Sequence, residues 1–105
     1  MSSPTPEAPS SDRSSGVPGT YCFRVTAEAE ISVLSRVLEL FVIRDALPIR
    51  VSSEVIEGSD PVQEIEIDVG GLEDHMAQHL SIRIEQFMSV QTVTMHRRLP
   101  VAAAA

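Results

Sequence analysis

The sequence predicts an α+β fold in which a four-stranded antiparallel sheet carries two helices on one face. The length of 105 residues has room for one domain. Apolar residues alternate with polar ones in several short segments, which is the period of a strand with one buried face. In two other segments they recur at helical spacing. The resulting order is β-α-β-β-α-β, the split βαβ arrangement.

The first half of the pattern contains a strand and a helix. The strand is predicted where Tyr21, Phe23 and Val25 alternate with Cys22, Arg24 and Thr26. The helix is predicted from apolar residues at helical spacing: Leu34, Val37, Leu38 and Phe41. It ends before Pro48.

The second half predicts a hairpin, a helix and a last strand. The hairpin strands contain Ile49, Val51 and Val55 and then Ile65, Ile67 and Val69, with turn residues 58–61 between them. The second helix is predicted from one apolar stripe: Leu72, Met76, Leu80, Ile84 and Phe87. The last strand carries Val90, Val93 and Met95, whose spacing breaks strict alternation and indicates a bulge.

Composition and charge exclude several classes of function. There are 15 acidic and 8 basic residues, a net charge of -7, and no basic stripe with interleaved aromatics, so we expect no nucleic-acid partner. No apolar run reaches the roughly 20 residues that span a bilayer, and a signal-peptide pattern is lacking. The single cysteine, Cys22, excludes an intramolecular disulfide. We therefore expect a cytoplasmic protein with no membrane partner.

The two ends of the chain differ in composition from its middle. Residues 1–19 are mostly Ser, Pro, Thr and Gly, and we expect a disordered tail that is either a leader without function or a tether to a partner. Residues 20–97 form the predicted domain, and residues 98–105 are expected to be a flexible C-terminal tail.

An acidic row marks the second hairpin strand. A strand order of 4-1-3-2 places Glu64, Glu66 and Asp68 near Arg24 and Arg50, on the face of the sheet without helices. This row is either a solvated, charge-paired face or a docking surface for a basic partner.

No arrangement of residues predicts catalysis. Gly70-Gly71 lacks the lysine and the glycine spacing of nucleotide-binding loops. Cys22 lies beside Arg24, which favours a thiolate, but a packed and inert thiol fits the strand as well. His75 and His79 are one helical turn apart and could chelate a metal, with His96 as a third ligand, or could be an exposed polar pair. We expect no catalytic residue, no metal and no cofactor.

The segment from Ser32 to Arg44 resembles the first loop and helix of ACT domains, especially that of the small regulatory subunit of acetolactate synthase. The pattern of that family is a Gly-x-Leu-Ser-Arg-Val run that ends in Leu-Phe and Arg-Gly. Seven residues match it as they stand: Leu34, Ser35, Arg36, Val37, Leu40, Phe41 and Arg44. The resemblance covers about residues 20–97 and implies a ferredoxin-like fold.

The resemblance also implies a binding site. In that family, an Asn and a Gly before the helix hold an amino-acid effector at a subunit interface, and here Ala29 and Ser32 take those places. Ser32 could cap the helix, and Glu28 or Glu30 could meet an ammonium group. The expected effector site is therefore one continuous segment: Glu28, Ala29, Glu30, Ile31, Ser32, Val33 and Leu34.

The resemblance implies a non-catalytic regulatory domain of branched-chain amino-acid biosynthesis. It would bind an amino-acid effector, pair with itself as a homodimer or a higher even oligomer, and regulate a catalytic large subunit. Two alternatives stay open: an interaction module whose effector site has decayed, and a small metal-binding or enzymatic protein on the same fold.

Overall fold

The computed structural model describes residues 18–98, and the remaining parts of both predicted tails lie outside the described residues. The elements follow in the predicted order: β1 (Gly19–Glu28), α2 (Ile31–Ile43), β2 (Pro48–Ile56), β3 (Val62–Leu72), α3 (Asp74–Glu85) and β4 (Val90–Arg98). The expected disorder of the tails stays a prediction.

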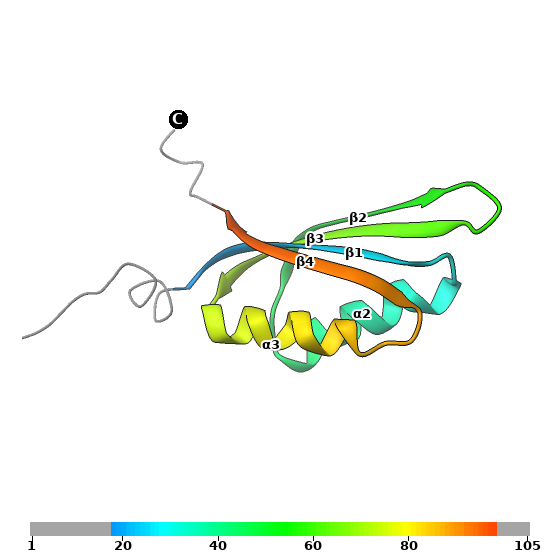
Figure 1. Ribbon diagram of the computed structural model, residues 1–105. Coiled ribbons are helices and arrows are strands. Elements are labelled where there is room, and N and C mark those ends of the chain that lie inside the picture. The colour runs from blue at the N-terminus through cyan, green and yellow to red at the C-terminus, as the bar shows by residue number, and fades with distance from the viewer. Residues whose placement is uncertain (1–17, 99–105) are drawn as a thin grey trace, which may run out of the picture.

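The strands form one four-stranded antiparallel sheet in the order β2-β3-β1-β4. Both helices lie on the same face of this sheet, and the other face is open (Figure 1). The chain therefore has the predicted α+β fold, with the βαββαβ order of ferredoxin-like domains. β2 and β4 are the two edge strands.

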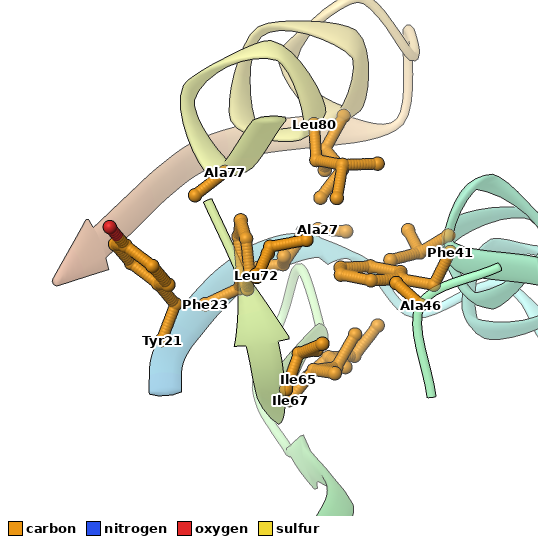
Figure 2. Packing of buried hydrophobic residues seen from close by; sticks show 14 of the residues in the cluster. Tyr21, Phe23, Ala27, Phe41, Ala46, Ile65, Ile67, Leu72, Ala77 and Leu80 are labelled. Atoms are coloured by element: carbon orange, nitrogen blue, oxygen red, sulfur yellow. The ribbon is translucent and has the colours of Figure 1, made fainter. Parts of the chain in front are cut away.

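The core lies between the sheet and the helices (Figure 2). Alternate residues of β1 and β3 point into it, and each helix contributes one stripe at helical spacing. The helix stripes are Val33, Val37 and Phe41 of α2 and Ala77, Leu80 and Ile84 of α3. The rings of Phe23 and Phe41 meet edge to face, with centroids 5.1 Å apart, and this contact fixes α2 against β1.

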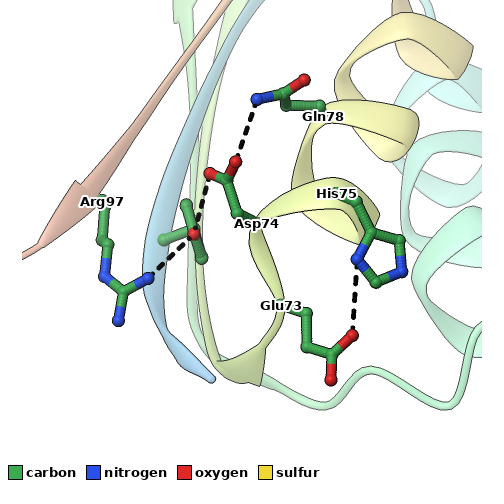
Figure 3. A network of polar contacts seen from close by, with 6 residues as sticks. Glu73, Asp74, His75, Gln78 and Arg97 are labelled. Carbon is green, nitrogen blue, oxygen red and sulfur yellow. Dashed lines mark hydrogen bonds and ion pairs between the residues drawn. The ribbon is translucent and has the colours of Figure 1, made fainter. Parts of the chain in front are cut away.

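Buried polar contacts fix α3 to the sheet at the other end of the domain. The Tyr21 hydroxyl donates to Oδ1 of Asp74 at 3.1 Å and accepts from Arg97 at 3.2 Å, so one group joins β1, α3 and β4. Figure 3 shows Asp74 also accepting from Gln78 and His75 beside Glu73. Burial of Tyr21 is the largest cause that raises the pKa of its hydroxyl, so this group stays protonated at neutral pH.

Three details refine the predicted elements. The bulge expected in the last strand is confirmed, because the register of β1 against β4 shifts between Thr26 and Ala27. Leu72 is the last residue of β3, so its assignment to the second helix was wrong. Phe87 was also assigned to that helix wrongly, because α3 ends at Glu85. Leu72 reaches the core from the strand instead, where it is 5% exposed. A core-facing position on a strand end and one on a helix start look alike in sequence.

Candidate functional site at the start of helix α2

The first turn of α2 has amide groups that no side chain caps. Glu30 is the N-cap residue, in an extended conformation, and its side chain makes no capping hydrogen bond. No acidic residue lies in the first turn. The first amides of a helix lack partners within the helix and carry the positive end of its dipole. This end of α2 therefore favours an anion such as a carboxylate.

Ser32 does not cap the helix, so that part of the prediction was wrong. It lies inside the helix, two residues after the N-cap, and its carbonyl accepts the Ser35 hydroxyl at 3.0 Å. The extended backbone of Glu30, rather than the residue type, sets the start of the helix. Sequence preference alone favours serine over glutamate as a cap.

The two predicted glutamates lie beside the loop between α3 and β4. The amide of Glu28 donates to the Ser89 carbonyl at 2.8 Å, and a carboxylate oxygen of Glu30 accepts the Ser89 hydroxyl at 2.8 Å. These contacts hold the loop before α2 against the loop after α3. Both glutamates remain exposed and can attract a cation.

A cavity of about 270 Å³ borders this helix start. Ser32, Val33 and Arg36 of α2 form one wall, and the stretch from Gln86 to Ser89 forms the other. This volume lies just below the usual range of small-molecule pockets, so it suits a small ligand. The Arg36 guanidinium adds a positive charge to the same wall.

Gln63 is a residue of this region that the sequence analysis missed. It is 8% exposed, and its Oε1 atom has no hydrogen-bond partner in the part of the chain that the structure describes. The β3 register sets Gln63 opposite Ala27, at the end of the sheet where α2 begins. A buried acceptor without a donor costs about 1–3 kcal/mol. In the sequence, Gln63 is a polar residue at a position where the alternation of β3, continued by Ile65 and Ile67, places a core-facing side chain.

The seven predicted site residues are consecutive in the sequence, and only two of them line the cavity. Ser32 and Val33 line the cavity, and Leu34 packs in part against the core. Ile31 is 98% exposed. The Ala29 side chain is exposed and its amide donates to the Pro61 carbonyl at 3.4 Å, which links the site to the β2-β3 turn.

The other candidate groups do not converge. His75 contacts Glu73, and His79 contacts Arg44, both on the helical side of the sheet. His96 pairs with Cys22 in the β1-β4 register and therefore lies on the open face. Between Pro18 and Arg98 no group of three or more His, Cys, Asp or Glu residues is arranged to hold a metal ion.

Cys22 is a packed thiol. Its side chain is fully buried, and burial is the largest cause that raises the pKa of the thiol, although a hydrogen bond with Arg98 acts in the opposite direction. A raised pKa keeps the thiol protonated at neutral pH, which removes the thiolate that a nucleophile needs.

The open face of the sheet is polar and partly charge-paired. Arg24 meets Glu66 at 2.7 Å, and Arg50 lies opposite Asp68 in the β2-β3 register, both as the predicted strand order implied. Asp68 also forms an ion pair with Arg98 at 3.4 Å. A shallow hollow of about 370 Å³ here is lined mainly by hydroxyl and charged side chains. Glu64 is directly opposite Glu54 of β2, so the face retains local negative charge.

Comparison with known proteins identifies the family. Residues 17–101 match the ACT-like domain family, and the chain belongs to it. ACT domains are typically regulatory modules that bind small ligands. No curated protein matches the sequence. No helix in residues 18–98 is long and apolar enough to cross a membrane.

Solved structures with low sequence identity share the fold. The ACT domain from the GTP pyrophosphokinase of Chlorobium tepidum superposes with a TM-score of 0.62 at 10% identity, over 75% of this chain and 99% of that one. The C-terminal domain of the MgtC protein from Mycobacterium tuberculosis superposes with a TM-score of 0.62 at 13% identity, over 79% of this chain and 89% of that one. These similarities concern the fold alone.

Proposed function

We propose that this chain is a non-catalytic regulatory module that binds a free amino acid at the start of α2. The observation that carries the proposal is the uncapped first turn of α2 beside a cavity of about 270 Å³. The α-carboxylate of the ligand would accept hydrogen bonds from the first amides of the helix, where the dipole also favours it. Val, Leu and Ile are the first candidates, by the resemblance of the helix to that of the acetolactate synthase small subunit.

Gln63 supports the recognition of the ammonium group of the ligand. An α-amino acid carries its ammonium group on the Cα atom, next to the carboxylate, and that group needs acceptors. The buried Oε1 of Gln63 and the exposed carboxylates of Glu28 and Glu30 are acceptors at this end of the sheet, outside the lining of the cavity, and the Glu30 carboxylate already accepts the Ser89 hydroxyl. We assign the ammonium group to these three residues.

The regulatory role rests on linkage. The module would pair with itself and with a catalytic large subunit, such as that of acetolactate synthase, and the ligand would favour one arrangement of the assembly. The matching helix motif supports membership of the ACT-like family more strongly than it supports this catalytic partner, because several of its residues serve packing. Val37 and Phe41 are buried in the core, and Leu34 and Leu40 pack against it.

A second candidate is an interaction module whose effector site has decayed. It is favoured by Ala29, whose side chain offers no polar atom at a place where the related family has Asn. The two candidates differ in one measurable property, which is whether the chain binds an amino acid.

A thermal-shift screen against the twenty amino acids tests the proposal. We expect one or more branched-chain amino acids to raise the melting temperature, because a ligand at 100 times its Kd stabilises the native state by about 2.7 kcal/mol. For a domain of this size each kcal/mol corresponds to roughly 4–8 °C. If no amino acid shifts the melting temperature at millimolar concentration, the effector proposal falls and the interaction module remains.

Two matched variants test the role of Gln63. Gln63→Leu removes the unpaired buried oxygen, so the free protein should be at least as stable as the wild type. Its affinity for the effector should fall at least about tenfold, equivalent to about 1.4 kcal/mol. Gln91→Leu makes the same change at an exposed position of β4 and should bind normally. Equal affinity in both variants would contradict the assignment of Gln63.

A further inference from the structure

Two cavities follow one another along the groove between α2 and α3, which lie side by side on the sheet (Figure 1). The first, of about 270 Å³, is the cavity beside the start of α2, and the second has a volume of about 80 Å³. The two cavities are one helical turn apart, because Arg36 lines the first and Leu40 lines the second. We call the surface that lines them the inter-helix groove, and its main residues are Val33, Arg36, Leu40, Ile43, Arg44, Leu80, Arg83, Phe87 and Met88.

The floor of the inter-helix groove is apolar. Leu80 is buried, and Leu40 packs against the core from the other helix. Ile43 and Met88 also line the groove, although they are 65% and 98% exposed. A cavity of 80 Å³ is far smaller than the usual small-molecule pocket, so it suits one apolar side chain of a partner better than a free ligand. Exposed apolar side chains beside such a cavity indicate a contact with another protein.

The positive charge of the inter-helix groove has no complement within the described domain. Three of its residues are arginines: Arg36, Arg44 and Arg83. Within residues 18–98 none of them forms an ion pair, and no Asp or Glu lines either cavity. The Arg44 guanidinium contacts Nε2 of His79, but a guanidinium has five N–H donors and this contact does not saturate it. In a chain with a net charge of -7, this groove therefore favours an acidic partner.

The spacing of the arginines matches the flanks of a helix. Arg36 and Arg44 are two turns apart on α2, which is about 12 Å at 1.5 Å per residue. Arg83 lines the other wall, in the cavity that Leu40 and Arg44 also line. Three charges spread over this length do not converge on one small anion. A partner helix along the groove meets all three with two carboxylates seven residues apart on one flank and a third on the other flank.

We propose that the inter-helix groove binds an acidic amphipathic helix of a partner protein. The apolar stripe of that helix packs on Leu40, Ile43 and Leu80, and its carboxylates pair with the arginines on both walls. The proposal goes beyond the amino-acid site. The two sites share the cavity that Arg36 lines, so the experiment below leaves Arg36 unchanged.

Fluorescence anisotropy with two designed peptides tests the proposal on the full chain. The first peptide is a helix of about two heptads with leucine along one stripe and glutamate on both flanks, and the second has glutamine in place of every glutamate. We expect the glutamate peptide to bind with a Kd in the micromolar range and the glutamine peptide to bind at least about tenfold more weakly. No binding of the glutamate peptide at about 100 μM, or equal affinity for both peptides, would overturn the proposal.

Arginine variants place the peptide on the protein. Arg44→Gln and Arg83→Gln remove one charge from each wall, so each should weaken binding of the glutamate peptide several-fold, and R44Q/R83Q should weaken it at least about tenfold. Arg50→Gln removes an exposed arginine from the open face of the sheet and should bind normally. Circular dichroism melting confirms that each variant folds. Wild-type affinity in R44Q/R83Q, or an equal loss in Arg50→Gln, would overturn the placement in the groove.

Two further measurements separate this proposal from others. Binding of the full chain to phosphatidylserine vesicles without binding of the glutamate peptide would assign the arginines to a membrane surface and overturn the proposal. A branched-chain amino acid that raises the melting temperature of R44Q/R83Q as much as that of the wild type would leave the effector proposal standing, even if the glutamate peptide binds neither protein.

Discussion

Asp45 adopts a backbone conformation that is unusual for a residue with a side chain. Its φ is 58°, in the left-handed region, directly after the C-cap residue Arg44. Its amide donates to the Val42 carbonyl at 3.0 Å, and the next amide, of Ala46, donates to the Phe41 carbonyl at 2.8 Å. These bonds close the end of α2, and glycine is the residue that adopts this conformation without steric cost.

Replacing Asp45 by glycine should therefore stabilise the protein. The left-handed conformation costs about 1–2 kcal/mol for most residues and less for aspartate, whereas glycine makes the unfolded chain more flexible. We expect Asp45→Gly to raise the free energy of unfolding by about 0.5 kcal/mol in urea denaturation.

A matched control is Asp60→Gly in the turn between β2 and β3, where φ is not positive. There glycine has only its entropic cost, so the variant should be neutral or slightly less stable. A loss of stability in Asp45→Gly as large as in Asp60→Gly would contradict the account of the α2 terminus.

Single residues also show where sequence reasoning stops. Tyr21, Phe23 and Val25 could be assigned to the core because strict alternation leaves one face apolar. Gln63 occupies a core-facing position in the alternation of β3, but a glutamine is ordinarily exposed, so its burial was missed until the sheet register showed what lies opposite it. The position of the N-cap at Glu30, instead of at Ser32, could not be predicted either, because the backbone conformation determines it.

Helix α2 combines a packing role with the proposed binding role. Its inner stripe, Val33, Val37 and Phe41, fixes it to the sheet, and no side chain caps its first turn at the sheet end. The two roles are separable because they lie on different parts of the helix. A substitution in the exposed first turn can change the electrostatics without changing the core.

An acidic residue in the first turn should stabilise the helix and block the ligand. Ser32→Asp places a carboxylate at the positive end of the dipole, which is worth about 0.3–1 kcal/mol. The same charge repels the carboxylate of an amino acid, so binding measured by calorimetry should be lost.

The matched control is Ser35→Asp, one turn further along the same helix. The dipole effect falls off within the first turn, so this variant should gain little stability and should bind normally. Loss of binding in both variants, or in neither, would show that the first-turn amides do not hold the ligand.

At the scale of elements, the helices and strands and the order of the strands in the sheet could be predicted, and the exposure of each strand could not. The periods of 2 and 3.6 indicated every strand and helix. The same apolar pattern in β2 and β3 led to opposite outcomes, because β3 lies inside the sheet and β2 lies at its edge. A pattern along one strand does not contain the position of that strand among its neighbours.

Three surfaces lie at different places on the molecule as a whole. The open face of the sheet is polar, the β2 edge is apolar, and the helix start lies at the end of the sheet beside the β2-β3 turn (Figure 1). Binding at the helix start can bias the association of two copies only as far as the ligand prefers the associated state.

Amide chemical-shift mapping tests the central claim, the amino-acid site at the start of α2, most directly. Val, Leu and Ile are titrated separately into ¹⁵N-labelled full-length protein to millimolar concentration. We predict that the largest shifts fall on the amides of residues 29–34 and on the side-chain amide of Gln63. Absence of shifts at millimolar ligand, or shifts centred on the open face of the sheet or on His75 and His79, would contradict the account.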